Sequence, residues 1–343
     1  MMAGQISLNR MPAPTWNRLG VNGALIDAKS FGGAGFAVPE EFRAVATGMG
    51  SEAAKLIAGS CTEHRFIEVR DGEILTEPVI AGRRLGDGER ESSVTLIHAG
   101  KNSSVTVLEF CESIEGHTAE RADLTYVIAE EGAKVHVVQA EMLSETSSYM
   151  SDTGIIAREN AEVRLSQVYL GGRSVYSGCE TGLSGDRSVF RLDTAYLGER
   201  DRALDMNYVV RQKGRDTESF LTASGALMGK SDKIYRGTLD FQKGAAGSKG
   251  REEENVLILS DSAKNRSVPV ILCSEEDVDG QHAATIGRID QDRLFYLMSR
   301  ALSEERAKKL IISSGLMPVI NAIPDEGVRN AAVNYLERRL SLD

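Results

Sequence analysis

The segments Gly132-Ala-Lys-Val135-His-Val137 and Asn160-Ala-Glu-Val163-Arg-Leu165 share one pattern, in which a turn residue precedes a short polar stretch and then alternating β-branched positions. Related segments begin at Asn102, Asp186 and Ser231. The first four recur at intervals of about 26 to 30 residues and the last one more widely. Repetition of this kind, without a strict period, predicts an irregular β-solenoid of the parallel β-helix type.

The alternation of side chains supports the same prediction over a long stretch of the chain, from about Phe66 to Ile289. Val135 and Val137 are expected to point inward, whereas Lys134 and His136 are expected to face solvent as ordinary strand residues. A jelly roll or another double sheet would show a similar alternation. The pattern alone therefore leaves that alternative open.

The two ends of the chain differ from this central region. Residues up to about Pro39 predict an extended arm, and the weak helical spacing of residues 40–58 predicts a short helix. Beyond Asp290 the period becomes helical, with Ser303 as a plausible N-cap and a second helix starting near Pro324. We expect an N-terminal arm and helical region over 1–60, a β-helix core over 61–290 and a C-terminal helical domain over 291–343.

Composition excludes several classes of function. The formal net charge is -10 and the pI is about 5.2, so the chain has no general attraction to nucleic acid or to anionic membranes. The N-terminus lacks the apolar stretch of a secretory signal, and the most apolar run, residues 310–323, is interrupted by Pro318. We therefore expect a cytoplasmic protein that neither spans nor binds a membrane.

Side chains that could bind a metal gather only once in the sequence. The turn from Glu275 to His282 holds four acidic residues and one imidazole, with Cys273 just upstream. Such a mixed set would tolerate Fe(II), but acid-rich turns between strands are more often simply solvated. The remaining cysteines and histidines form no recognised ligand motif.

Common catalytic patterns are missing from the sequence. It contains neither a phosphate-binding loop nor a serine-hydrolase elbow. A polysaccharide-cleaving β-helix would need paired carboxylates along a groove with stacking aromatics, and Trp16 is the only tryptophan. An adaptor or scaffold is therefore favoured over a self-contained enzyme.

The C-terminal third resembles a known family. The segments 255–263, 277–287, 294–305 and 323–326, together with Pro269, are similar to the C-terminal signature of the SufB/SufD family of iron–sulfur cluster assembly proteins. The stretch from Pro12 to Asn22 is similar to the opening of the SufD branch. The resemblance implies a right-handed parallel β-helix flanked by helices.

The same resemblance implies partners for the chain. The C-terminal helices would bind SufC, an ABC-type ATPase, and an end of the β-helix would pair with a SufB-like paralogue or with a second copy of this chain. The residues that we expect in the ATPase-docking region are Leu294, Phe295, Tyr296, Leu297, Arg300 and Leu302. An aromatic group beside an arginine is typical of interface hot spots.

The resemblance also assigns a site. His282 matches the SufD histidine and is the candidate ligand or transfer residue for iron or a cluster, with Asp277 expected to orient its ring. Asn255 and Ala283 stand where the SufB branch carries a functional Cys and Glu. Any thiolate ligand is therefore expected from another chain, and the transient iron or cluster is expected at the interface of the complex, with none tightly bound to the isolated chain.

The resulting hypothesis is a non-enzymatic, SufD-like subunit of a SufB–SufC–SufD scaffold. Three other hypotheses stay open at this point. They are a homo-oligomeric SufB/SufD-type scaffold acting with SufC alone, a carbohydrate-active β-helix enzyme, and a purely structural interaction protein.

Overall fold

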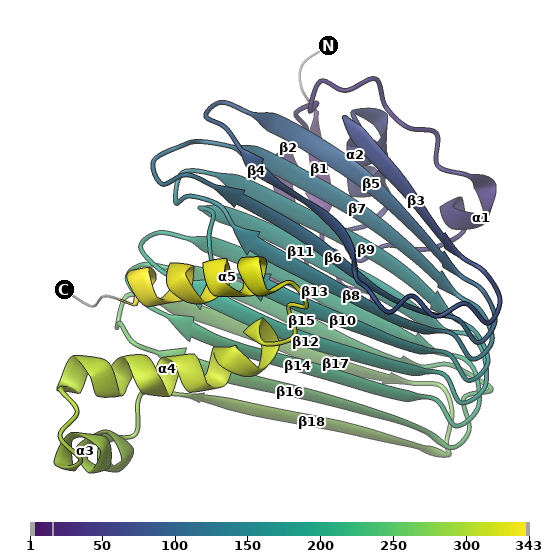
Figure 1. Cartoon of the computed structure of the whole chain (residues 1–343). Helices are drawn as coiled ribbons and strands as arrows, with labels where there is room; N and C mark the ends of the chain where they lie inside the picture. Colours follow the sequence, from purple (N-terminus) through teal and green to yellow (C-terminus); the bar gives the residue numbers. More distant parts are fainter. Residues whose placement is uncertain (1–3, 16, 341–343) are drawn as a thin grey trace.

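A computed structural model describes residues 4–15 and 17–340, and its centre is a parallel β-solenoid (Figure 1). Successive strands alternate between two eight-stranded sheets, so that each turn of the coil gives one strand to each sheet. The strands of both sheets are paired in parallel, which confirms the predicted β-helix and excludes the jelly roll. The odd sheet holds β3 (Glu63–Val69), β5 (Arg90–Ala99), β7 (Glu120–Ala129), β9 (Ser148–Ala157), β11 (Ser174–Leu183), β13 (Ala203–Gln212), β15 (Asp232–Phe241) and β17 (Lys264–Cys273). The even sheet holds β4 (Val79–Leu85), β6 (Ser104–Ser113), β8 (Lys134–Met142), β10 (Glu162–Tyr169), β12 (Val189–Gly198), β14 (Glu218–Leu227), β16 (Ser248–Ile258) and β18 (Val278–Gly287).

The turn residues of the sequence repeat stack on one another before the strands of the even sheet. Asn102, Gly132 and Asn160 all have positive φ, at 56°, 69° and 55°, which explains why glycine and asparagine recur there. Each donates its backbone N–H to a carbonyl one turn further along the coil. In the fourth unit the left-handed residue is Arg187 rather than Asp186, and the unit at Ser231 precedes β15 of the odd sheet, so it does not belong to this stack.

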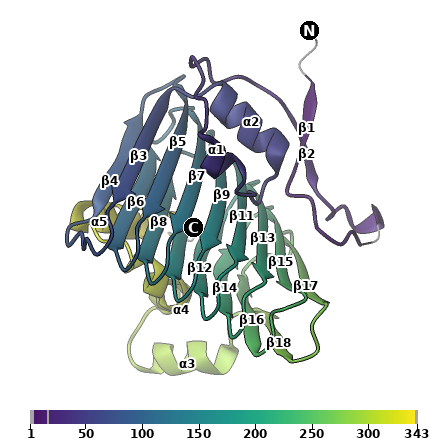
Figure 2. The same ribbon diagram turned by 90° about the vertical axis from the view of Figure 1, so that its right-hand side faces the viewer.

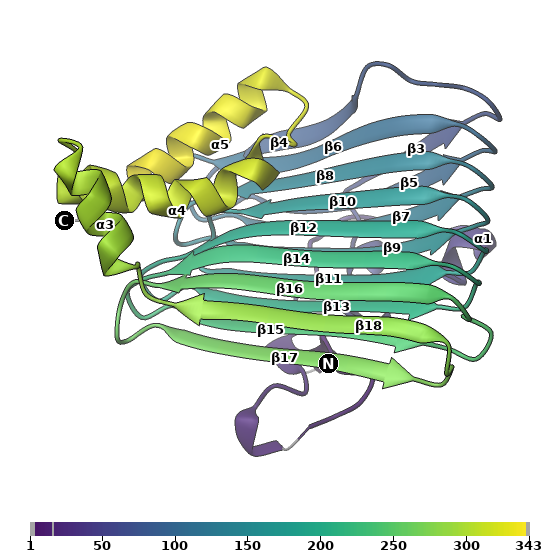
Figure 3. The ribbon, with the colours of Figure 1, turned by 90° about the horizontal axis from the view of Figure 1, so that it is seen from below.

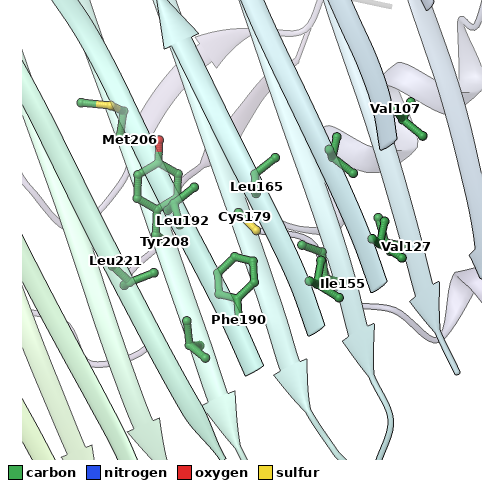
Figure 4. Packing of buried hydrophobic residues seen from close by; sticks show 14 of the residues in the cluster. Val107, Val127, Ile155, Leu165, Cys179, Phe190, Leu192, Met206, Tyr208 and Leu221 are labelled. Atoms are coloured by element: carbon green, nitrogen blue, oxygen red, sulfur yellow. The ribbon is translucent and has the colours of Figure 1, made fainter. Parts of the chain in front are cut away.

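Inward-facing side chains of the two sheets form the main core, as Figure 4 shows for ten labelled residues that include Val107, Phe190 and Tyr208. Val135 and Val137 belong to this core, as the alternation predicted. The prediction for His136 was wrong, because this residue is half-buried and its Nε2 lies 3.0 Å from Ser166 Oγ. Burial lowers the pKa of His136 to about 4, with a smaller contribution from Arg164.

The N-terminal segment covers the outer face of the odd sheet (Figure 2). The expected helix over 40–58 is divided into α1 (Glu40–Arg43) and α2 (Ser51–Gly59), whose apolar side chains pack on β5, β7 and β9. The predicted arm contains a small antiparallel sheet of β1 (Gln5–Leu8) and β2 (Ala24–Asp27), with a 3-10 turn, η1 (Asn17–Leu19), between the strands. Trp16, part of the expected extended segment, lies outside the described residues.

A close approach of two backbones explains the break between α1 and α2. A Cβ added to Gly48 would lie 1.9 Å from the amide nitrogen of Cys179, and one added to Gly178 would lie 2.3 Å from the amide nitrogen of Met49. The segment between the helices therefore rests directly on the backbone of β11. This contact depends on tertiary structure, so the helical spacing of the sequence could not reveal it.

The C-terminal helices cover the outer face of the even sheet, with α4 (Glu304–Ile320) over β10, β12 and β14 and α5 (Glu326–Arg339) over β8. Ser303 caps α4 as predicted, and Asp325 caps α5. Leu310 of α4 is exposed, because only one side of this helix is covered. α3 (Gln291–Ser299) lies beyond the sheet, next to the first turn of α4. Among the described helices, none is long and apolar enough to cross a bilayer.

A buried carboxylate anchors the N-terminal segment to β9. Asp152 Oδ1 accepts a hydrogen bond of 2.8 Å from the amide of Met49, while Oδ2 has no partner. Burial is the main reason that the pKa of Asp152 rises to about 7 from an ordinary value of 3.8. The folded state therefore holds a proton that the unfolded state has lost at the same pH.

We predict that Gly178→Ala weakens the docking of the N-terminal segment. The added methyl group would overlap Met49 and Gly48, so the free energy of unfolding in urea should fall by about 2 kcal/mol. Gly182→Ala is the matched control on the same strand, because its nearest neighbour, Ile155 O, would be 3.8 Å away. Equal unfolding midpoints for the two variants would contradict this account.

We also predict that Asp152 makes the protein less stable as the pH rises. The pKa of Asp152 is higher in the folded state than in the unfolded state, so its contribution to stability is complete below about pH 4. Between pH 4 and pH 7 the free energy of unfolding falls by about 1.4 kcal/mol per pH unit, until the contribution is lost as the pH rises through 7. Asp152→Asn keeps an acceptor for Met49 and cannot ionise. Between pH 4 and 7, the urea midpoint of the variant should therefore rise relative to the midpoint of the wild type. A constant difference would argue against the raised pKa.

Candidate site at the open end of the solenoid

The solenoid ends at β17 and β18, the outermost strands in Figure 3. In the described chain β18 pairs only with β16 and β17 only with β15, so one edge of each strand carries free backbone donors and acceptors. Almost every residue of β18 is exposed. The last turn thus leaves both a strand edge and the end of the interior uncovered.

His282 lies on this last strand, in register with Glu252 of β16. The two side chains project to the same side, and His282 Nδ1 is 3.9 Å from Glu252 Oε2. This separation is too long for a hydrogen bond. The imidazole is 31% exposed and the carboxylate only 1% exposed, so the pair extends from the interior to the surface.

Three charged side chains meet inside the last turns. Lys233 of β15 forms an ion pair with Glu254 and also contacts Ser267 Oγ at 3.2 Å. Glu252, two residues before Glu254, has no hydrogen-bond partner on either carboxylate oxygen. Its carboxylate occupies the space left by Gly237, where a Cβ would lie 2.3 Å from Oε1.

The electrostatics of this group follow from burial and from an excess of negative charge. The pKa of Glu252 rises to about 8, mainly because of burial and with a further contribution from the nearby Glu254, while Lys233 acts in the opposite direction. Burial also lowers the pKa of Lys233, although the contact with Glu254 works in the opposite direction. The carboxylates of Glu252 and Glu254 thus lie near a single ammonium group, that of Lys233, and all three side chains are buried.

The acid-rich turn, for which the sequence favoured simple solvation over metal binding, does not bring its side chains together in space. Glu275 accepts a hydrogen bond from the amide of Gly244, and Asp279 accepts one from Gln281. Within residues 4–15 and 17–340, no group of three or more His, Cys, Asp or Glu side chains is placed to hold a metal. Two carboxylates of the turn, those of Glu275 and Asp279, thus hold neighbouring groups of the chain.

The predicted role of Asp277 in orienting His282 stays a prediction. Asp277 is exposed in the turn before β18, where its backbone carbonyl accepts a hydrogen bond from Gly247. The carboxylate that the structure does place beside His282 belongs to Glu252. Glu252 was not predicted, because it lies in a run of three consecutive glutamates, 252–254, in which the residue pattern alone does not show which carboxylates point inward.

The other residues considered at this end lie apart from His282. Asn255 is in register with Thr285, and Ala283 with Glu253, so by alternation both face the other side of the sheet. Cys273 ends β17 and is exposed, with its Sγ 3.1 Å from the carbonyl oxygen of Glu275. The described chain therefore brings no thiol to the His282 side.

The residues predicted to bind the ATPase divide into two groups. Leu294, Leu297 and Leu302 face inward and pack with Ala307 and Ile311 of α4. Phe295 and Tyr296 are 73% and 56% exposed, and the guanidinium of Arg300 lies 5.3 Å from the ring centre of Tyr296. The exposed Met298 and Leu310, which the sequence analysis did not select, add apolar surface to the same helical unit.

Comparisons with known proteins point to one family. A family model described as "SUF system FeS cluster assembly, SufBD core domain" matches residues 84–314. This match covers most of the solenoid and continues into α4. It therefore includes both His282 and the helical surface around Phe295.

Individual relatives carry the same description. The chain is 28% identical to the iron–sulfur cluster assembly protein SufD of Bacillus subtilis over 247 residues, which cover 71% of this chain and 56% of that protein. It is 30% identical over 237 residues to an iron–sulfur cluster assembly SufBD family protein of Pyrococcus horikoshii, covering 68% and 52% of the two chains. A chloroplastic SufBD family protein of Arabidopsis thaliana is 27% identical over 251 residues, covering 71% and 45%. The chain spans about half the length of the curated relatives it matches.

Proposed function

The chain belongs to the SufBD family of the SUF system for iron–sulfur cluster assembly, and we propose that it acts as a SufD-like scaffold subunit rather than as an enzyme. The observation that carries this proposal is the position of His282 on the free edge strand of the solenoid. An imidazole there can contribute to a site that a second chain completes. The family membership also favours this function over the carbohydrate-active alternative.

The open end is suited to pairing with another β-solenoid. Free backbone groups along β17 and β18 can extend either sheet across an interface, and the exposed Ile271 and Ile286 add apolar area. The partner is a SufB-like paralogue, which would supply the thiolate that this face lacks. A second copy of this chain is the alternative partner, and it would leave the site without that thiolate.

The helical unit α3–α4 is suited to binding a SufC-like ATPase. Phe295, Tyr296 and Arg300 present an exposed aromatic and cationic surface, whereas the inward leucines hold α3 in place. The small core beneath α3 also includes Leu257 and Leu259, at the end of the strand that carries Glu252. A movement of the ATPase would thus reach the last turns of the solenoid through packed side chains.

Iron or a nascent cluster is the cargo of such a complex rather than a resident group of this chain. His282 offers one nitrogen ligand that is partly accessible from outside. A site for an iron–sulfur cluster requires further thiolate or imidazole ligands. We therefore place the cargo between this chain and its partner.

We predict that Phe295→Ser combined with Tyr296→Ser weakens ATPase capture by about tenfold or more, because two exposed aromatic anchors are lost. The measurement is co-purification of a co-expressed SufC-like ATPase, followed by titration of the purified proteins. Leu25→Ser is the control, since Leu25 is 69% exposed on β2, far from α3 along the chain. Equal capture by both variants would refute docking at α3.

We predict that His282→Ala lowers the yield of cluster formed by the assembled complex on anaerobic reconstitution with iron and sulfide. Absorbance of the bound cluster and iron content per complex are the two measurements. Gln281→Ala is the matched control, because Gln281 is the preceding residue of β18, points to the opposite face and donates its side-chain hydrogen bond to Asp279. Equal yields for the two variants would exclude a role of His282 in cluster formation.

A further inference from the structure

The other buried carboxylates of the solenoid accept at least one hydrogen bond, and this makes Glu252 unusual. Glu109 accepts hydrogen bonds from Thr125 and Gln139, and Glu141 accepts from Arg202 and two backbone amides. Among the buried carboxylates in the described part of the chain, Glu252 is the one with no hydrogen-bond partner on either oxygen. A carboxylate that is 1% exposed and lacks such partners is costly to bury.

The charges around Glu252 do not balance. Lys233 is already engaged by Glu254, which also accepts a hydrogen bond of 3.4 Å from Tyr196. The hydroxyl of Tyr235, another inward residue of β15, has no partner either. Lys233 can therefore neutralise only one of the two carboxylates, and Glu252 is left either to hold a proton or to bind a cation.

His282 is the neighbouring side chain that could bind a cation together with Glu252. Metal–nitrogen and metal–oxygen bonds of about 2.1 Å each can span the 3.9 Å between His282 Nδ1 and Glu252 Oε2. A hydrogen bond cannot span that distance. The imidazole is partly exposed, so an ion could enter from the open end of the coil and keep its remaining positions for water or for ligands of a partner.

We propose that Glu252 and His282 together form a two-ligand site for a divalent transition-metal cation at the open end of the solenoid. One carboxylate oxygen and one imidazole nitrogen suit borderline cations such as Fe(II), Co(II) or Zn(II) better than Mg²⁺ or Ca²⁺. The inference rests on the proposed function only for the identity of the cargo, Fe(II). The position of the site follows from the geometry of this chain.

Gly237 has a defined part in this site. Because it has no side chain, the carboxylate of Glu252 can lie against β15 with its oxygens directed across the coil. A methyl group at this position would overlap both oxygens, at 2.3 and 2.8 Å. Gly237 is thus a positioning residue for the carboxylate.

The experiment is anaerobic titration of the full chain with Co(II), followed by visible absorption, and with Fe(II), followed by calorimetry. We expect one ion per wild-type chain. Glu252→Gln and His282→Ala should each weaken the affinity by about tenfold or more, since each removes one of two ligands. Glu253→Gln is the matched control, because Glu253 is the next residue of β16, faces outward and pairs with Arg251.

Three outcomes would overturn the proposal. They are no binding of either cation by the wild type, binding that Glu252→Gln leaves unchanged, and equal loss of affinity in Glu253→Gln. If Glu252→Gln does not fold, Gly237→Ala answers the same question, because it keeps the carboxylate but displaces it. Cluster yield and ATPase capture by the assembled complex are separate measurements from metal binding by the isolated chain. The proposed function can therefore fail while metal binding persists, and metal binding can fail while the proposed function persists.

Discussion

Parallel, in-register stacking of the turns determines where nearly every side chain of the solenoid lies. Each strand is hydrogen-bonded to strands one turn away, so the neighbour of an inward residue is the residue at the same register position about 30 positions along the chain. Gln139 therefore reaches Glu109 in the turn before it and Gln167 in the turn after it, and polar groups in the core satisfy one another. The same rule places His282 beside Glu252.

A stacked coil must end somewhere, and its last turn has no successor. The interior polar groups of earlier turns have neighbours on both sides, whereas those of β18 have a neighbouring strand, β16, on one side only. Unsatisfied polar atoms, an unpaired strand edge and partly exposed core residues therefore occur together at this end. A site shared with another chain can form there without disturbing the ladder that stabilises the rest of the solenoid.

Features that depend on local sequence were predictable. The stacked turns at Asn102, Gly132 and Asn160 follow from residue type, because these residues adopt positive φ readily, and the cap of α4 follows from the properties of Ser303. Features that depend on register were not. The break between α1 and α2 requires Gly48 to meet Gly178, which lies far away in the sequence. Likewise, His282 was chosen by resemblance, but Glu252 could be joined to it only once the turns were aligned.

The site and the proposed docking surface are linked by one strand. β16 carries Glu252 near its middle and ends at Ile258, and the following Leu259 packs with Leu257 beneath α3. β18, which carries His282, is held by β16 on one side and is free on the other. A force applied at α3 would therefore act on the strand that supports the least restrained part of the sheet.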